Sequence, residues 1–445
     1  MSGPDTIAAL ATPAGAGGIA VVRVSGPQAL AIAQKLTDCK TFTANTIKPC
    51  NFYDARRTEK LDYGLLSIFR GPHSFTGEDS AEFNCHGSYF LAQKILEQTL
   101  ICGARLAVPG EFTKRAFLAG KIDLTQAESL ADMLNAGSDW QLQLALKHLD
   151  GDVARKIKQL RQNIMAVLSE LEAALDYPEE IADPAPEKIR SLLTGVLAEI
   201  EQLSAHSRQG LVIKSGANVV LAGRTNAGKS SLFNALLKYE RAIVTDIPGT
   251  TRDALEAEIN LGGFKVTLVD TAGLRAAGDT LEQIGIARGR ERLKSADLIL
   301  YVLDAVSGLT AEDKQNLAEL PEQKTLLVLN KSELPDSQDY PGALKISAQT
   351  GLGLDSLTSG IINFLGLQNI DFNKNIYISS LRQQDKLQQA GRILAKALAG
   401  LQAAGYPDVL SGCLKELAVT LGEITGEEVS AEIIEEIFAN FCVGK

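Results

Sequence analysis

The sequence predicts an α/β domain that is inserted into a helical domain and preceded by an α+β domain. Three observations support this. Short β-like runs and turns fill residues 1–118, helical periodicity occupies 119–212 and returns at 371–445, and apolar strands alternate with helical segments across 213–370. A chain of 445 residues exceeds what one hydrophobic core usually covers, so several domains are expected.

The first region, residues 1–118, contains two clear strand candidates. Residues 19–26 (IAVVRVSG) alternate in polarity and stop at Gly26-Pro27, and residues 61–69 (LDYGLLSIF) form the second candidate. Turns separate these runs, which favours an α+β arrangement.

The second region is helical. Apolar residues recur at spacings of three and four from Leu142 to Leu175, which predicts one long helix with a single apolar face. Tyr177-Pro178 should end that helix, and another is expected over 189–203. Leucines restore the helical period after residue 370. Because helices flank the α/β region on both sides, an inserted domain is the simpler arrangement. Two unrelated helical domains are the alternative.

The region between the helices contains five continuous apolar strand candidates. They read NVVLAG, FKVTLVD, DLILYVLDA, TLLVLN and ALKIS, and helical or loop segments separate them. Such a pattern is typical of a parallel sheet that is covered on both faces.

A phosphate-binding loop follows the first of these strands. Residues 223–230 (GRTNAGKS) match the pattern GxxxxGK(S/T). Its glycines let backbone N–H groups close around phosphates, the Lys229 ammonium reaches the β and γ phosphates, and the Ser230 hydroxyl binds Mg²⁺. The helix that follows presents its positive end to the anion. We therefore expect a nucleoside triphosphate here.

Two companion motifs strengthen this prediction. Residues 270–273 (DTAG) close a strand, so the Asp270 carboxylate could hold the Mg²⁺ shell and the Gly273 amide could lie near the γ-phosphate. Residues 245–253 (TDIPGTTRD) suit a switch that senses the γ-phosphate, with Thr251 as the second Mg²⁺ ligand. A plain surface turn is the alternative for this loop.

The base specificity depends on Asn330 and Lys331, on Glu333, and on Ser347-Ala348 after the last strand. The common motif is NKxD, and glutamate replaces its aspartate here. Glutamate keeps the carboxylate, so we expect guanine over adenine. A nucleoside triphosphatase that does not distinguish guanine is the alternative. The residues predicted to contact GTP are Asn226, Ala227, Gly228, Lys229, Ser230, Ser231, Thr245, Asp246, Ile247, Pro248, Gly249, Thr250, Thr251, Asp270, Thr271, Ala272, Gly273, Asn330, Lys331, Glu333, Ser347 and Ala348.

Hydrolysis requires a group that orients water. Leu274 follows DTAG, where Ras-like proteins have a glutamine, so we hypothesise that Glu282 does this work. An exposed glutamate at a helix start is the alternative. Positive charge is also needed between the phosphates. Arg252 and Arg275 are rival sources of this charge, and a K⁺ ion caged by oxygens of Asn226, Thr245, Ile247 and Thr250 is another.

Composition narrows the class of protein. The net charge of −10 gives no global attraction to nucleic acid, so RNA contact would need a local basic patch or a partner. Six cysteines without a CxxC pair argue against a metal knuckle or a disulfide framework. The N-terminus has no secretory pattern and no apolar run is long enough to span a bilayer. We expect a cytoplasmic protein without a membrane segment.

Several segments resemble the MnmE (TrmE) family of tRNA-modifying GTPases, and the resemblance covers essentially the whole chain. The segments are DTIAALATPAGAGGIAVVRVSG, FTGEDSAEFNCHGS, PGEFTKRAFLAGKIDLTQAESLADML, GRTNAGKSSLFNALL, IVTDIPGTTRD, DTAGLR and the final FCVGK. The sequence departs from the family pattern at Glu333, at Ser88 in an HGG run, and at Ala14 and Ala16.

This resemblance implies a K⁺-dependent GTPase that forms a homodimer. By motif position, Asn226, Thr245, Ile247 and Thr250 would be the K⁺ ligands, Ser230 and Thr251 the Mg²⁺ ligands, and Glu282 the catalytic carboxylate. The family works with the flavoprotein MnmG, which brings FAD. Together they build an aminomethyl or carboxymethylaminomethyl group on C5 of the wobble uridine (U34) of certain tRNAs.

The resemblance also implies a folate site in the N-terminal domain. The carbon comes from a reduced folate, either 5,10-methylene- or 5-formyl-tetrahydrofolate, and the matching contacts are Arg23, Glu82, Lys121 and Lys445. Cys442 could serve one-carbon chemistry or pack as a small apolar residue. Two other classes stay open: a GTPase of ribosome assembly, and a folate-dependent methyltransferase in which the GTPase domain only regulates.

Overall fold

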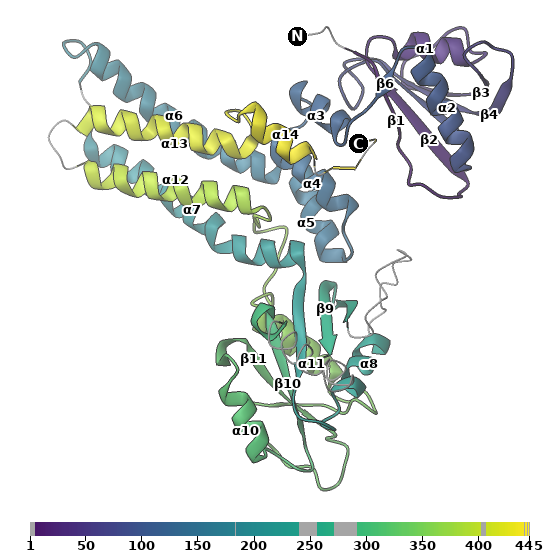
Figure 1. Ribbon diagram of the computed structural model, residues 1–445. Coiled ribbons are helices and arrows are strands. Elements are labelled where there is room, and N and C mark those ends of the chain that lie inside the picture. Colours follow the sequence, from purple (N-terminus) through teal and green to yellow (C-terminus); the bar gives the residue numbers. More distant parts are fainter. Residues whose placement is uncertain are drawn as a thin grey trace, which may run out of the picture. The chain divides into compact units, whose positions relative to one another are not determined.

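The computed structural model in Figure 1 describes residues 5–182, 184–239, 256–270, 292–401, 406–439, 441–442 and 444. The chain forms two compact units. The N-terminal unit contains residues 1–131, 154–161 and 419–445, and the central unit contains residues 132–153 and 162–418.

The N-terminal unit is built on a six-stranded sheet of order β3-β4-β5-β2-β1-β6. Neighbouring strands are antiparallel except for β1 and β6, which are parallel. The expected strands at 19–26 and 61–69 are confirmed as β2 and β4. The strands are β1 (Ile7–Leu10), β2 (Ile19–Ser25), β3 (Thr46–Tyr53), β4 (Lys60–Phe69), β5 (Ser80–His86) and β6 (Arg105–Leu106).

Two helices cover this sheet, α1 (Ala29–Leu36) and α2 (Tyr89–Ile101). Their apolar faces pack on alternate residues of β2 such as Val22 and Val24, because side chains of a strand point to opposite faces in turn. The resulting α+β arrangement agrees with the prediction.

A small helical cluster completes the N-terminal unit. It contains α3 (Glu111–Leu118), α4 (Leu124–Leu134) and α14 (Ala431–Ala439). Phe438 packs with Leu124 and Phe441 in its core. Gly110 precedes α3 with φ of 67°, and a Cβ there would lie 2.4 Å from the carbonyl oxygen of Phe438. Only glycine fits this close approach.

The central unit contains a second six-stranded sheet, of order β12-β11-β10-β7-β9-β8. All neighbours are parallel except β8 and β9. The sequence predicted parallel strands here but not the antiparallel β8, which has a polar residue at every second position. The strands are β7 (Ala217–Ala222), β8 (Glu256–Leu261), β9 (Phe264–Asp270), β10 (Leu298–Asp304), β11 (Thr325–Asn330) and β12 (Leu344–Lys345).

Helices cover both faces of the second sheet, as its apolar strands predicted. Val219 and Leu221 of β7 pack toward α8 (Lys229–Tyr239) and α11 (Leu354–Phe364). The alternate residues Val220 and Ala222 share a core with Leu317 of α10 (Ala311–Ala318). The short helix η2 (Glu322–Lys324) precedes β11.

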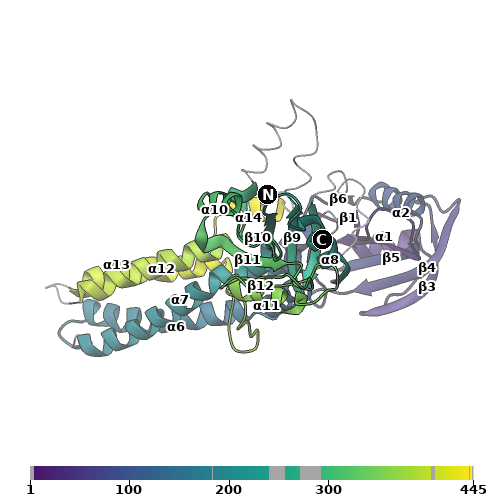
Figure 2. The same ribbon diagram turned by 90° about the horizontal axis from the view of Figure 1, so that it is seen from below.

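The remaining helices come before and after this sheet in the amino-acid sequence. Helices α7 (Pro186–Ser215) and α12 (Leu381–Gly400) precede and follow it, and they lie side by side in Figures 1 and 2. The Gln384 amide donates a hydrogen bond to Ser207 Oγ at 2.9 Å across their contact. Helix α13 (Tyr406–Thr425) follows. The helices on either side of the α/β region therefore belong together, which confirms the insertion.

The expected single helix from Leu142 to Leu175 is wrong. The structure has two helices, α5 (Asp139–Leu149) and α6 (Asp152–Asp176). Gly151, with φ of 83°, lies between them and interrupts the helical backbone. Leu142 and Leu146 are 41% and 43% exposed, so the apolar spacing continues across a break without forming one buried face. No helix in the described ranges is long and apolar enough to cross a membrane.

One buried carboxylate stabilises the N-terminal unit. Glu111 is 7% exposed, and its two oxygens accept hydrogen bonds from Arg105 at 2.8 and 2.5 Å and from Arg115 at 2.9 Å. The backbone N–H of Val108 donates a fourth hydrogen bond at 3.0 Å. Burial alone would raise the pKa of Glu111, but the hydrogen bonds from Arg105 and Val108 outweigh it and hold that pKa below its ordinary value.

We expect Glu111→Ala to lower the free energy of unfolding by about 1–3 kcal/mol, because it leaves buried donors without their acceptor. Since the folded-state pKa is depressed, the contribution is complete above the ordinary pKa of 4.5 and is lost as the pH falls through the folded-state value. Urea unfolding at pH 7 and at lower pH would measure both effects. The exposed Glu97→Ala is the matched control. Equal stability of the two variants at pH 7 would contradict the prediction.

Candidate nucleotide-binding site

The phosphate-binding loop connects β7 to α8. Three of its residues have positive φ: Gly223 at 135°, Asn226 at 66° and Gly228 at 92°. A Cβ on Gly223 would lie 2.4 Å from the Val302 carbonyl oxygen, and one on Gly228 would lie 2.1 Å from Asn330 Nδ2. The two glycines are therefore required by packing as well as by backbone conformation.

Lys229 lies inside this loop. The side chain is only 7% exposed, and its ammonium donates hydrogen bonds of 2.8 Å to the carbonyl oxygens of Gly223 and Arg224. The loop therefore holds a buried positive charge at the N-terminus of α8. Phosphate oxygens are the ligands that suit this combination of ammonium and helix N-terminus.

Ser230, a predicted Mg²⁺ ligand, lies beside Asp270, the carboxylate that we expect to support the Mg²⁺ shell. Ser230 Oγ donates a 2.7 Å hydrogen bond to Asp270 Oδ2, and Asp270 is 6% exposed at the end of β9. A hydroxyl and a carboxylate beside the phosphate loop are hard oxygen donors, which Mg²⁺ prefers. These residues would hold Mg²⁺, which when bound would offset the negative charge of the phosphate groups.

The base-recognition residues join the same site. Asn330 Nδ2 donates to the Ala227 carbonyl at 3.1 Å, and Asn330 Oδ1 accepts from the Ala348 N–H at 3.0 Å. One buried side chain thus ties the phosphate loop to residues 347–348. Ser347 is fully buried, and its hydroxyl accepts a 3.0 Å hydrogen bond from the Thr350 N–H.

Glu333 provides the test of whether this site fits guanine. Its Oε2 is buried and has no hydrogen-bond partner among the described residues. An unpaired buried carboxylate oxygen is costly, so its presence indicates a partner other than the described residues. Guanine offers an N–H and an amino group, which suit a carboxylate acceptor, whereas the adenine N1 carries no hydrogen.

The sequence-based prediction missed Asp304. Lys331 Nζ donates to Asp304 Oδ2 at 2.7 Å and to the Asn226 carbonyl at 3.0 Å. Burial alone would raise the pKa of Asp304, but the hydrogen bonds from Lys331 and the Val306 N–H hold it below its ordinary value. One feature of the sequence could have indicated Asp304: it is the aspartate that ends the otherwise apolar β10. In the sheet, Asp304 pairs in register with Asn330 of β11.

The structure brings together one part of the predicted GTP set. The phosphate loop, Asp270, Asn330, Lys331, Ser347 and Ala348 are linked by the hydrogen bonds above, and Ser231 follows Ser230 in α8. Apart from Glu333, the other predicted residues lie outside the described residues: Thr245, Asp246, Ile247, Pro248, Gly249, Thr250, Thr251, Thr271, Ala272, Gly273 and Glu282.

The predicted folate residues lie in the N-terminal unit. Arg23 Nε donates to Glu82 Oε1 at 2.8 Å, from facing positions of β2 and β5. An Arg23 guanidinium N–H also donates to the Gly444 carbonyl at 3.2 Å, which places the C-terminal segment beside this pair. Lys121 donates instead to the Pro72 carbonyl at 2.8 Å. Lys445 lies outside the described residues.

Two protein-family models match most of this chain. The family model described as "MnmE helical domain" matches residues 124–442, and "GTP-binding protein TrmE N-terminus" matches residues 6–121. The G domain of the T. maritima FeoB iron transporter is a solved structure that matches 33% of this chain and 98% of its own, with 28% identity and a TM-score of 0.26.

Two relatives that match this chain over almost their full length have the same name. A protein of Moorella thermoacetica named tRNA modification GTPase MnmE is 39% identical over 460 residues, covering 99% of both chains. The protein of that name from Lactobacillus gasseri is 40% identical and covers 99% of this chain and 98% of its own. The chain therefore belongs to the MnmE family of tRNA modification GTPases.

Proposed function

We propose that this protein hydrolyses GTP in a K⁺-dependent reaction and, with the flavoprotein MnmG, takes part in forming the 5-(carboxymethyl)aminomethyl group on U34 of certain tRNAs. The observation that carries the proposal is the phosphate loop closed over Lys229 and tied by Asn330 to Ala348, in a chain that is similar over its full length to tRNA modification GTPases. A site for a guanine nucleotide would use all of these groups.

The residues of this chain would divide the work between binding and catalysis. Lys229 and the backbone N–H groups of the loop position the phosphates, and Glu333 accepts from the base. Ser230 and Thr251 would hold Mg²⁺. Glu282 would orient the attacking water, a role that Leu274 cannot fill in this sequence.

A caged K⁺ would supply positive charge between the β and γ phosphates. Its ligands in this proposal are Asn226, Thr245, Ile247 and Thr250. Asn226 supports the proposal because its left-handed backbone is fixed by the hydrogen bond from Lys331 to its carbonyl oxygen.

Turnover should depend on the monovalent cation. We expect GTP hydrolysis in K⁺ to be at least roughly tenfold faster than in Na⁺ at the same ionic strength, because Na⁺ is too small for the same oxygen cage. Steady-state phosphate release from the purified protein would measure this. Equal rates in the two salts would reject the K⁺ cage and leave Arg252 and Arg275 as the sources of charge.

Replacing Glu282 should separate binding from catalysis. We expect Glu282→Ala to lower GTP turnover by about 100-fold without changing nucleotide affinity, because the carboxylate would act on water and not on the nucleotide. Single-turnover hydrolysis and a fluorescent GTP analogue would report the two quantities. Glu312→Ala, at an exposed position of α10, is the control. Unchanged turnover would end this proposal.

A reduced folate, 5,10-methylene- or 5-formyl-tetrahydrofolate, would supply the carbon, and FAD would come from MnmG. The Arg23–Glu82 pair supports a folate site, since a carboxylate can face the N–H edge of a pterin and cations can face its glutamate tail. An open pocket of about 1000 Å³ lies at the end of the same two strands, lined by residues 14–18 and 86–90. Lys121 and Lys445 would complete the site, and the homodimer would form through the N-terminal region.

The whole proposal is tested in cells that lack this protein. We expect the nucleosides of their tRNA to lose the C5 substituent at U34, and mass spectrometry of digested tRNA would measure this loss. Wild-type protein should restore the substituent, and the Lys229→Ala variant should not. Normal U34 together with defective ribosomal subunits would instead support a GTPase of ribosome assembly.

A further inference from the structure

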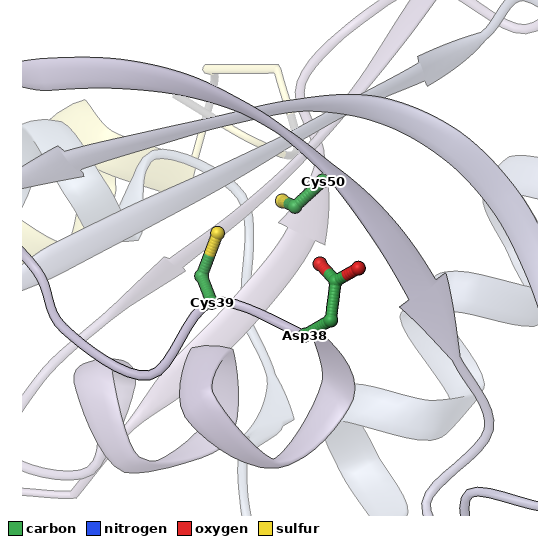
Figure 3. Close-up of side chains that lie close together, drawn as sticks. All are labelled: Asp38, Cys39 and Cys50. Atoms are coloured by element: carbon green, nitrogen blue, oxygen red, sulfur yellow. The ribbon is translucent and has the colours of Figure 1, made fainter.

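Three metal-ligating side chains converge in the N-terminal unit. Asp38, Cys39 and Cys50 each offer one ligand atom, and these atoms all lie within 4.8 Å of one another. Figure 3 shows Asp38 and Cys39 on the loop that follows α1, with Cys50 facing them from β3. Two sulfurs and one carboxylate form a donor set that favours Zn²⁺ and similar thiophilic cations over Mg²⁺ or Ca²⁺.

We propose that Asp38, Cys39 and Cys50 bind one thiophilic divalent cation of the Zn²⁺ class, with water as the fourth ligand. In a tetrahedral site with bonds of roughly 2.0–2.3 Å, neighbouring ligand atoms lie roughly 3.3–3.8 Å apart. The three atoms therefore need to approach one another by at most about 1.0–1.5 Å. Each thiol releases its proton to solvent as its metal–sulfur bond forms, so the reaction needs no oxidant.

One of the three ligands, Asp38, is held in place by a neighbour on β3. The Asn51 N–H donates to Asp38 Oδ1 at 3.0 Å, and the Asn51 amide donates to Asp38 Oδ2 at 2.6 Å. The Asp38 N–H donates in return to the Asn51 carbonyl at 3.4 Å. Each carboxylate oxygen keeps a second lone pair for a metal. Asn51 thus orients the Asp38 carboxylate, as residues that hydrogen-bond to metal ligands do in other metal sites.

A cation could reach this cluster from solvent. Cys50 is 3% exposed, Cys39 is partly buried and Asp38 is exposed, so the cluster runs from the core to the surface. Thr37 forms a bridge to Phe52 of β3, which fixes the loop just before the ligands. One side of the cluster is therefore open to solvent, and the three ligand atoms already lie near one another.

Titration of the reduced, nucleotide-free full-length protein with Co²⁺ would test this site. Thiolate ligands give Co²⁺ a strong near-ultraviolet charge-transfer band, which oxygen ligands at the GTP site do not. We expect one equivalent of Co²⁺ to produce the band and Zn²⁺ to displace it. Cys39→Ser should abolish the band, and Asn51→Ala should weaken Co²⁺ binding by roughly 10- to 100-fold.

Cys102→Ser is the matched control, because Cys102 packs against the same core but is not one of the three ligands. It should bind Co²⁺ as the wild type does. Absence of the band in the reduced wild type would overturn the proposal, as would an unchanged band in a folded Cys39→Ser variant. If that variant does not fold, as judged by circular dichroism, Asp38→Asn and Asn51→Ala carry the test, and unchanged affinity in both would overturn it.

Discussion

Lys229→Ala is expected to weaken GTP binding by about 2–5 kcal/mol, or roughly 30- to 5,000-fold in Kd. The side chain is almost fully buried in the phosphate loop, where its ammonium donates hydrogen bonds to the carbonyl oxygens of Gly223 and Arg224. Without this charge, the GTP phosphates lose the Lys229 ammonium as a hydrogen-bond donor and counter-charge. Isothermal titration with a non-hydrolysable GTP analogue would measure the change.

Lys238→Ala is the matched control for this prediction. Lys238 is exposed in the last turn of the same helix α8, so its loss removes the same charge without touching the loop. We expect its Kd to stay within about twofold of the wild type, because solvent screens exposed charges. Similar weakening in both variants would mean that net charge governs affinity, and an unchanged Kd in Lys229→Ala would contradict the site.

Glu333→Ala is expected to lower the preference for GTP over ATP by roughly 100-fold or more. The buried Oε2 has no partner among the described residues, and two hydrogen bonds to a charged acceptor contribute about 1.5–3 kcal/mol each. A site built to pair with a group rejects a ligand that lacks it, since its own buried polar atoms are then left unpaired. Competition between GTP and ATP for the purified protein would measure the ratio.

Two further variants make the Glu333 test specific. Glu333→Asp shortens the side chain by one methylene but keeps the carboxylate, so we expect it to retain the preference for guanine. Glu319→Ala removes an exposed carboxylate after α10 and should behave as the wild type. A GTP preference that survives in Glu333→Ala would show that another group recognises the base.

Local patterns predicted the elements but not every boundary. The strands at 19–26 and 61–69 and the helix end at Tyr177-Pro178 follow from alternation and from proline chemistry, and they agree with β2, β4 and the end of α6. The spacing of leucines could not reveal the break at Gly151. A glycine in the left-handed conformation interrupts the backbone while the apolar period runs on through it.

The sequence by itself determined the phosphate chemistry of this protein. The loop at 223–230 is contiguous, so its glycines, its lysine and its serine are fixed relative to one another by a few bonds and by the helix that follows. The sequence also placed Asp270 and Asn330 at strand ends, where parallel strands deliver side chains to one edge of a sheet.

Only the tertiary structure decided which distant groups meet. The strand order of the second sheet sets the pairing of Lys331 with Asp304 and the bridge from Asn330 to Ala227 and Ala348. It also sets the position of the Glu333 oxygen that has no partner in the described part of the chain. The same holds for Asp38, Cys39 and Cys50, which lack any metal-binding spacing in sequence. Strand register and helix packing set these contacts, and both result from burial summed over the whole core.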